Sequence, residues 1–212
     1  MIQIDDAGSG SLLGGTCIGV MRVETGEYCY DIVPLEFYRP QDFKDKKYQD
    51  FVIDIVAGAI NSINIDKGEP IHVCRGYMFD KLKRWLKANG FNASSTKIED
   101  PLQTIVEKTF EDYTISLGLP PRYIRYTKYP FHFHRLLRWV YADYENRKDL
   151  CKTGWSSWQK YGMLPLKISY GSVEKPNYYC LKCGSRIQPG SGAKIIKYIT
   201  NRVNKVYLHE SC

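Results

Sequence analysis

Four cysteine and histidine residues near the C-terminus constrain this chain most. They follow the spacing C-x2-C-x25-H-x2-C and are Cys180, Cys183, His209 and Cys212. Two residues between paired ligands allow a tight turn to point both side chains at one ion, and zinc prefers thiolates and imidazoles. Four protein ligands leave no open coordination position. The spacing therefore predicts one structural Zn ion within residues 180–212.

The segment between the two ligand pairs predicts a β-hairpin, because the β-prone runs KIIKYIT and KVYLH are joined by NRVN. The ligand pattern resembles treble-clef zinc fingers. It is also similar to the nick-sensing fingers of poly(ADP-ribose) polymerases, with a shorter interval between the pairs. Two roles follow from the resemblance: the finger binds nucleic acid, or it only staples this segment to the rest of the fold.

The chain has 212 residues, of which 43% are hydrophobic, enough for a sizeable core. Its remaining cysteines are scattered, namely Cys17, Cys29, Cys74 and Cys151. This is not the density of a secreted disulfide scaffold, so we expect a reducing, cytoplasmic setting. No stretch reaches the roughly 18–20 apolar residues of a membrane helix. The first residues lack the basic and apolar parts of a signal peptide, and we expect no membrane partner.

Charge divides the chain into an acidic and a basic part. Residues 1–118 contain 13 Lys and Arg against 18 Asp and Glu, a net charge of −5, and residues 119–212 contain 17 against 5, a net charge of +12. A basic surface favours an acidic partner, although a solvated surface without a partner is the alternative. The segment GLPP at 118–121 predicts a boundary. We expect domains at 1–118, 119–179 and 180–212.

Residues 1–118 alternate between strand and helix signals. Alternating β-branched and aromatic runs predict strands over 1–5, 16–23, 27–34, 69–74 and 93–99. Helical periodicity predicts helices over 40–63, 78–88 and 102–117. The resulting order, β-β-β-α-β-α-β-α, predicts an α/β fold whose mixed sheet carries helices on its faces.

This order and the opening segment IDDAGSGSLLGG resemble the ribonuclease H-like superfamily. The resemblance implies acids on the first strand, first helix, fourth strand and last helix, which bind two divalent ions, Mg or Mn, and cleave phosphodiester bonds. Carried over by position, it implies Asp5 with Asp6 beside it, Asp50 on the first helix, and Glu107 or Glu111 on the last helix. The first-helix assignment rests on the stretch YQDFVIDIVAG.

Cys74 departs from that pattern, because it stands where the superfamily has an acid at the end of the fourth strand. Cysteine is a poor ligand for the hard Mg²⁺ ion. Two interpretations follow: the site uses other acids, such as Glu99 or Asp100, or the domain has lost activity. A solvated face is a further alternative for Asp50 and Asp54, since surface helices commonly carry such acids.

Residues 120–179 carry 14 of the 29 aromatic residues, among them Tyr126, interleaved with Lys and Arg. Cations that neutralise phosphates and rings that stack on bases are typical of proteins that bind nucleic acid, DNA or RNA. The predicted nucleic-acid-binding residues are Arg122, Arg125, Lys128, Arg135, Arg138, Trp155 and Trp158. Alternatively, the rings pack the core of a second domain. One basic amphipathic helix is predicted over 131–150.

These observations favour a metal-dependent nuclease or resolvase-like enzyme that acts on structured nucleic acid. Its divalent ion would be held by Asp5, Asp50 and one of Glu107 or Glu111. The first alternative is a non-catalytic nucleic-acid-binding adaptor built on a degenerate ribonuclease H-like domain. The second is a scaffold whose zinc finger binds a protein partner. Phosphate-driven binding weakens steeply with salt, which separates nucleic-acid binding from an apolar interface.

Overall fold

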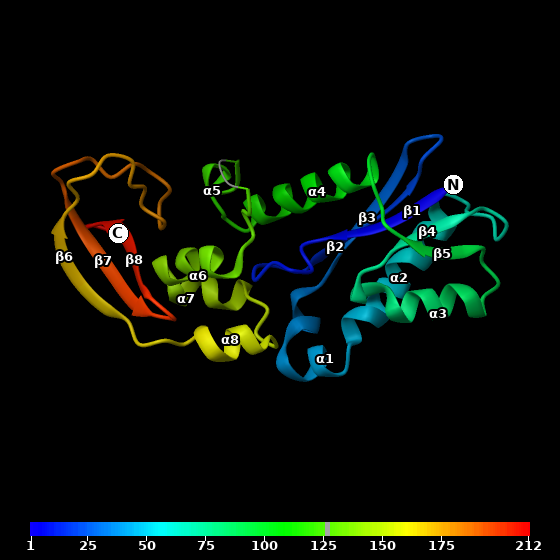
Figure 1. Ribbon diagram of the computed structural model, residues 1–212, viewed down its shortest axis with the longest axis horizontal. Helices are drawn as coiled ribbons and strands as arrows, with labels where there is room; N and C mark the ends of the chain where they lie inside the picture. The colour runs from blue at the N-terminus through cyan, green and yellow to red at the C-terminus, as the bar shows by residue number, and fades with distance from the viewer. Residues whose placement is uncertain (126–127) are drawn as a thin grey trace.

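The computed structural model describes residues 1–125 and 128–212 (Figure 1). The molecule is elongated. A five-stranded sheet with its helices forms one end, a three-stranded sheet forms the other, and a group of short helices lies between them. The two termini lie toward opposite ends (Figure 1).

The larger sheet has the strand order β3-β2-β1-β4-β5. Its strands are β1 (Ile2–Ala7), β2 (Thr16–Arg22), β3 (Glu27–Val33), β4 (Ile71–Cys74) and β5 (Ala93–Thr96). β1 pairs antiparallel with β2 and parallel with β4, and β4 pairs parallel with β5. The prediction of an α/β fold with a mixed sheet is confirmed.

Helices cover both faces of this sheet. They are α1 (Pro40–Lys44), α2 (Lys47–Ser62), α3 (Asp80–Ala88) and α4 (Leu102–Ser116), with 3-10 turns η1 (Leu35–Tyr38) and η2 (Tyr77–Phe79). Residues of α2 and α3 share one hydrophobic core with the sheet, and residues of α4 share another with it. Covered on two sides, β1 and β2 are buried almost throughout, as is typical of central strands in α/β proteins.

The prediction of one helix over 40–63 is wrong, because the chain breaks between α1 and α2. Lys46 adopts the left-handed conformation with φ of 56°, which no continuous right-handed helix can contain. The break turns the chain before α2 crosses the sheet.

The second half begins with short helices, α5 (Pro121–Arg125), α6 (Phe133–Ala142), α7 (Tyr144–Arg147), η3 (Lys148–Leu150) and α8 (Ser156–Tyr161). The prediction of one helix over 131–150 is therefore wrong. Asp143 ends α6 with φ of −154° and ψ of 64°, outside the helical region. The chain then changes direction, so that α7 packs beside α6.

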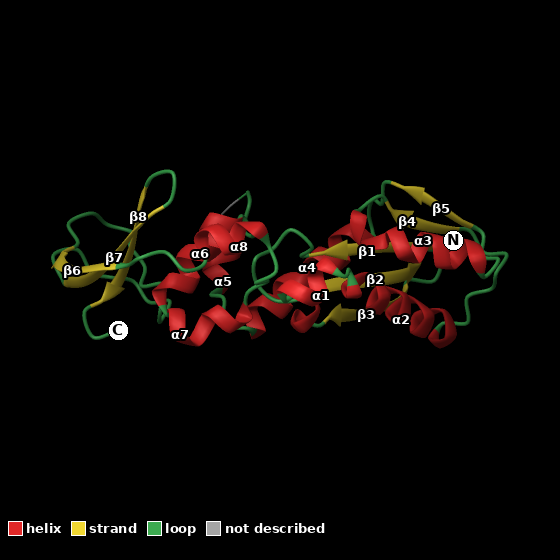
Figure 2. Cartoon of the chain, turned by 90° about the horizontal axis from the view of Figure 1, so that it is seen from below, coloured by secondary structure: helices red, strands yellow, loops and turns green. Residues whose placement is uncertain are grey.

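The smaller sheet has the order β6-β7-β8, with β6 (Lys167–Ser172), β7 (Gly192–Ile199) and β8 (Val203–His209). β7 and β8 form the predicted hairpin, with Ile199 opposite Val203. β6 was not predicted, and it pairs along the other edge of β7. Figure 2 shows this sheet separated from the larger one by the helices of the second half.

Residues on both sides of position 180 share one hydrophobic core, which contains Trp139 of α6, Tyr198 of β7 and Leu208 of β8. Leu12 and Leu13, from the loop after β1, belong to the same core. Leu13 forms a β-bridge with Cys151. The loop between β1 and β2 is thus packed into the second half of the protein.

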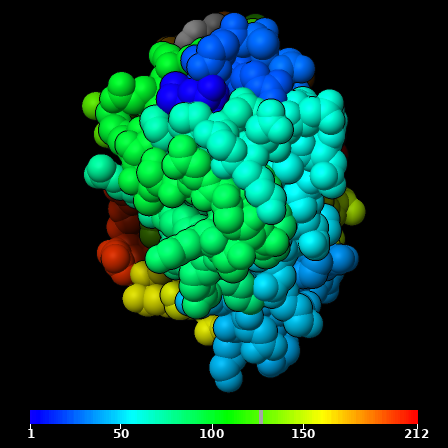
Figure 3. All heavy atoms as spheres, turned by 90° about the vertical axis from the view of Figure 1, so that its right-hand side faces the viewer, coloured from blue at the N-terminus to red at the C-terminus, as the bar shows by residue number. Residues whose placement is uncertain are grey.

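Viewed from the end that carries the larger sheet, the surface is formed almost entirely by the N-terminal half, and C-terminal segments appear only at the rim (Figure 3). Among residues 1–125 and 128–212, no helix has the length and apolar character needed to cross a bilayer.

Candidate functional site

The four predicted zinc ligands come together beside the smaller sheet. One ligand atom from each of Cys180, Cys183, His209 and Cys212 lies within 4.8 Å of the others. Nδ1 of His209 is 3.3 Å from Sγ of Cys183 and 3.9 Å from Sγ of Cys212. Ligand atoms placed about 2.0–2.3 Å from one shared zinc ion have similar separations. This group could hold a zinc ion, as the spacing predicted.

The local backbone aims these ligands. Gly184 has φ of 77°, and its amide donates to the carbonyl of Cys180 at 2.8 Å, which closes the turn after the first pair. In His209, Nε2 faces the carbonyl oxygen of Arg186 at 3.1 Å. A hydrogen bond from Nε2 to a carbonyl leaves Nδ1 free to bind a metal.

Two thiols of this group, those of Cys183 and Cys212, have pKa values shifted in opposite directions. Although burial opposes it, hydrogen bonds from the Ser185 amide, Cys180 and His209 lower the pKa of Cys183 to about 6. Burial and the neighbouring thiols raise the pKa of Cys212 to about 11. Thiolates are the metal-binding form, so a bound zinc ion would displace the proton that Cys212 keeps.

Arg147 fixes the zinc-binding turn to α6. Its side chain is buried and donates to the carbonyls of Leu181 at 2.8 Å and Lys182 at 2.9 Å, which lie between the first two cysteines. It also donates to the carbonyl of Trp139 at 2.7 Å and stacks 3.9 Å from the centre of that ring. A buried cation with these acceptors holds the turn rigidly against the helix.

A second group of potential ligands lies at the carboxyl ends of β1 and β4. These strands are parallel neighbours, with Ile4 opposite Val73, so Asp5 and Cys74 follow side by side. Ligand atoms of Asp5, Asp6 and Cys74 lie within 4.8 Å of one another. The carboxyl ends of parallel strands are where open α/β sheets place their sites.

Burial is the main influence on the pKa values of the two acids in this group. Burial raises the pKa of Asp5, against hydrogen bonds from the Cys74 thiol and the Asp6 amide. Burial likewise raises the pKa of Asp6, against a hydrogen bond from Ser9 and the charge of Lys152. Adjacent carboxylates in a buried setting favour either a proton or a bound cation.

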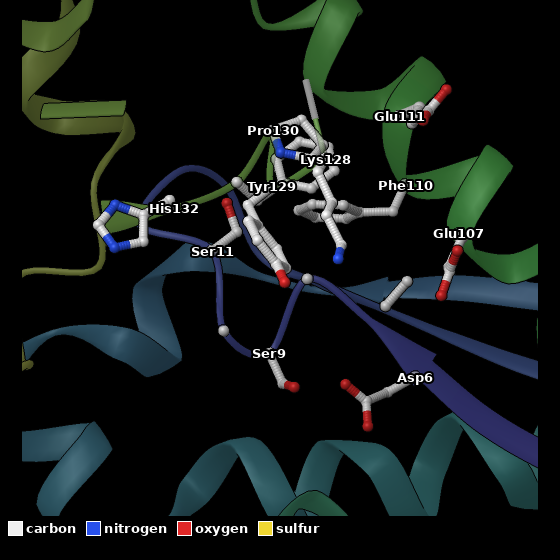
Figure 4. A pocket seen from close by; sticks show the side chains of 14 residues that line it. Asp6, Ser9, Ser11, Glu107, Phe110, Glu111, Lys128, Tyr129, Pro130 and His132 are labelled. Carbon is white, nitrogen blue, oxygen red and sulfur yellow. The ribbon is translucent and has the colours of Figure 1, made fainter. Parts of the chain in front are cut away.

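A cavity of about 490 Å³ opens beside the acids (Figure 4). Asp6 of β1 and Glu107 of α4 lie on one side of it, and Lys128, Tyr129 and His132 lie on the other. In Figure 4 the Lys128 amine reaches toward the space between the two carboxylates. We call this space the acidic cavity. Two carboxylates therefore stand opposite a cation and an aromatic ring across this cavity.

The glycine-rich segment after β1 forms another wall of the acidic cavity. Gly8 has φ of 88°, and a side chain there would begin only 2.1 Å from the ring of Phe110. Glycine is therefore required, and it lets α4 approach β1 closely enough for Glu107 to face the cavity.

Lys152 supports this segment from behind. Its side chain is fully buried, and its Nζ donates to the carbonyl of Gly8 at 2.6 Å and to Oγ1 of Thr16 at 3.2 Å. Burial lowers the pKa of Lys152 to about 7, and the charge of Asp6 opposes that shift. The loop that borders the acids is thus held by a residue from the second half of the chain.

Asp50 does not join the acids of β1, contrary to the sequence-based prediction. It is exposed on α2, and its carboxylate accepts hydrogen bonds from Nζ of Lys81 on α3 at 2.7 and 2.8 Å. The face of α2 that carries Asp50 turns toward α3 because the opposite face packs on the sheet. Glu99, the proposed substitute, is exposed and pairs with Lys97 at 3.0 Å.

The last helix contributes one acid that faces the site. Glu107 lies beside the acidic cavity, and its charge contributes to the raised pKa of Asp5. Glu111 lines the same cavity one turn further along α4 but points away from Asp6 in Figure 4. It lies 3.9 Å from Nζ of Lys108.

The predicted nucleic-acid-binding cations fall on separate surfaces. Lys128 borders the acidic cavity, whereas Arg125 is exposed at the end of α5. A different cavity is lined by the remaining three, Arg122, Arg135 and Arg138. Tyr126 lies outside the described residues.

The two predicted tryptophans are packing residues. Trp158 is 7% exposed and belongs to the core of the second half, so its ring has no free face for a base. Trp155 is partly buried against the same core, with Nζ of Lys152 5.4 Å from its ring centre. This placement matches the alternative in which large rings fill a second core.

Sequence reasoning assigned Ser9 and His132 to no site, and it named Tyr129 only among the aromatic residues that could stack on bases. Ser9 hydrogen-bonds Asp6, and Tyr129 and His132 line the same cavity. The signals were present: a serine in the glycine-rich loop, and a histidine in a run of aromatic and basic residues. Their meeting depends on the loop after α5 returning to β1, which no local pattern specifies.

No protein-family model matches the sequence. The curated proteins likewise contain no match to this chain.

Proposed function

We propose that residues 1–118 form a ribonuclease H-like domain and that the protein is a metal-dependent nuclease acting on structured nucleic acid. An antiparallel meander followed by two parallel strands, with helices on both faces, supports the fold assignment. The single observation that carries the function is the pair of acids at the end of β1, Asp5 and Asp6, next to a cavity that Asp6 and Glu107 line and whose far wall is basic and aromatic.

Each residue of the site has a role in this proposal. Asp5, Asp6 and Glu107 hold a divalent cation, Mg²⁺ or Mn²⁺, through carboxylate oxygens. When bound, such a cation lowers the pKa of a water nucleophile and neutralises the charge that develops on phosphate. Lys128 neutralises the phosphate from the other side, and Tyr129, with 64% of its surface exposed, stacks on a base.

The test is cleavage of a labelled panel containing a single strand, a duplex, an RNA–DNA hybrid, a flap and a four-way junction. Each substrate is incubated with Mg²⁺, Mn²⁺ or EDTA. We expect metal-dependent cleavage that is lost in Asp5→Asn and Asp6→Asn. Asp50→Asn is the matched control, because it removes an acid that pairs with Lys81 outside the site. This variant is expected to keep the cleavage activity of the wild type.

One observation favours a second candidate, a nucleic-acid-binding adaptor without activity. Burial and the nearby carboxylates raise the pKa of Cys74 to about 11, so a protonated thiol stands beside Asp5 in place of an anionic ligand. Salt-sensitive binding without cleavage of any substrate in the panel would favour the adaptor and reject the nuclease.

A further inference from the structure

A second cavity lies where α5 and α6 meet the zinc-binding segment. Its volume is about 620 Å³, and it shares no lining residue with the acidic cavity. Its walls include three arginines and several tyrosines, among them Arg122, Arg135, Arg138, Tyr123, Tyr179 and Tyr207, and no Asp or Glu lines it. We call it the arginine cavity.

The protein supplies no anion to these three arginines. Among residues 1–125 and 128–212, none of them forms an ion pair. Nη2 of Arg138 donates to the carbonyl of Lys205 at 3.1 Å, and Nη1 of Arg122 lies 3.5 Å from the hydroxyl of Tyr179. Nε of Arg135 and Nε of Arg138 are buried without a described hydrogen-bond partner. Nη2 of Arg135 donates to the carbonyl of Tyr123 at 2.5 Å. Three positive charges therefore line one cavity without an acidic partner among the described residues.

Aromatic rings and helix geometry orient these cations. The guanidinium of Arg135 lies 3.9 Å from the centre of the Tyr123 ring, and that of Arg122 lies 5.8 Å from the centre of the Tyr179 ring. Arg135 and Arg138 are three residues apart on α6, which places them on one face of the helix. A stacked guanidinium is a planar fork of donors that matches phosphate oxygens two at a time.

We propose that the arginine cavity binds a nucleotide that carries a phosphomonoester, which is the phosphorylated end of a nucleic-acid strand. A phosphomonoester carries about −1.5 to −2 charges at pH 7, whereas an internal phosphodiester carries one. Three uncompensated arginines therefore favour an end over the middle of a strand. The tyrosine rings offer apolar faces for the attached nucleoside.

A third hollow shares lining residues with both cavities. It is lined by His132, which also lines the acidic cavity, and by Arg135 and Arg138, which also line the arginine cavity. Arg202 and Asn204 add to its polar wall. In this proposal, a strand anchored by its end runs past these polar residues toward the acids. This path of the strand rests on the proposed nuclease function. It implies that cleavage occurs at a fixed distance from the phosphorylated end.

Binding is measured in EDTA, so that it does not depend on cleavage. Oligonucleotides of one sequence carry a 5′-phosphate, a 3′-phosphate or hydroxyls at both ends. We expect one phosphorylated strand to bind about tenfold tighter than the hydroxyl strand, the gain from one or two charge-assisted hydrogen bonds. A nucleoside monophosphate competes with it, and the matching nucleoside does not. Equal affinity for all three strands, or equal competition by the nucleoside, overturns the proposal.

Substitutions in the arginine cavity test whether this cavity causes the preference for the phosphorylated strand. Arg122→Gln and Tyr179→Ala change side chains at the exposed rim, and each is expected to reduce the preference to roughly twofold or less. Arg84→Gln is the matched control, because it removes an exposed arginine of α3 outside this cavity, and it keeps the preference. An undiminished preference in both rim variants overturns the assignment to this cavity.

Cleavage of the labelled panel distinguishes failure of the end-binding site from failure of the proposed nuclease. If the panel is cleaved, the products of the phosphorylated strand are expected to have one length measured from that end, and Arg122→Gln spreads the lengths. If nothing is cleaved while the end preference is present and lost in the rim variants, the nuclease proposal fails and the binding site stands.

Discussion

The thiol of Cys74 stands beside the carboxylate of Asp5 at the ends of two parallel strands, and their ligand atoms lie within 4.8 Å of one another. The sulfur thus occupies a place beside Asp5 where an acid would offer a further carboxylate ligand. Oxygen-only sites suit Mg²⁺, whereas a sulfur ligand shifts preference toward softer divalent ions. Compared with a carboxylate at this position, Cys74 is therefore expected to weaken Mg²⁺ binding at the proposed site.

Cys74→Asp tests this relationship. The substitution adds a fourth carboxylate to Asp5, Asp6 and Glu107, so we expect Mg²⁺-supported cleavage to rise by about tenfold, which corresponds to one extra hard ligand. Cys74→Ser, which keeps a neutral donor to Asp5, is the control and leaves the Mg²⁺ rate near that of the wild type. Rates with Mg²⁺ and Mn²⁺ on the preferred substrate provide the measurement, and a fall in the Mg²⁺ rate of Cys74→Asp contradicts the prediction.

Zinc stoichiometry tests the C-terminal site. We expect elemental analysis to find one zinc ion per chain in the wild type and none in His209→Ala. The variant should also lose several kcal/mol of folding stability, because the free energy of zinc binding contributes to folding. Cys29→Ser is the control, since Cys29 lies outside the ligand group, and it retains both zinc and melting temperature. A full zinc content in His209→Ala would reject the ligand assignment.

Salt dependence tests the basic wall of the acidic cavity. Lys128→Gln removes one cation that faces the proposed phosphate, so the slope of log K against log salt concentration should become shallower by about 0.7–0.9. Binding is titrated in EDTA between low and moderate salt. Lys83→Gln on α3 leaves the slope unchanged if the nucleic acid follows the proposed path.

Stability as a function of pH tests the burial of Lys152. Its folded-state pKa of about 7 lies below the ordinary value of 10.5. Between these values the unfolded chain binds the proton that the folded protein lacks, so the free energy of unfolding contributed by this residue rises with pH. The free energy of unfolding is measured with urea at several pH values for the wild type and for Lys152→Met. From pH 7 to 10 the value for the wild type should rise relative to that of the variant, and below pH 7 the difference between the two should stay constant. A difference in free energy of unfolding that stays constant from below pH 7 to pH 10 contradicts the lowered pKa of Lys152.

Local sequence patterns were sufficient where short-range spacing decides the structure. The zinc ligands and the β7–β8 hairpin follow from residues a few positions apart, because the turn geometry is local. The order of strands and helices in residues 1–118 was predictable for the same reason, since periodicity reports which face of each element is buried.

Long-range contacts account for what the sequence did not predict. β6 is mostly exposed and becomes a strand only by pairing with β7. The resemblance assigned Asp50 as a ligand, yet the packing of α2 against α3 gives it Lys81 as a partner. Lys152 and Arg147 belong to the basic stretch of the sequence, but both are buried and donate to carbonyls of residues far away along the chain. In each case the deciding partner lies many residues away along the chain.

The loop after β1 has a consequence for how the protein is made. Its Leu12 carbonyl accepts from the Lys152 amide at 2.9 Å, its Gly14 amide donates to Leu150 at 2.9 Å, and Gly8 accepts from the Lys152 side chain. During synthesis the ribosome releases the acids of β1 early, whereas the residues that hold their loop emerge more than a hundred codons later. A nascent chain therefore carries the acids long before it can complete the site, and any cleavage activity is delayed until the second half has emerged.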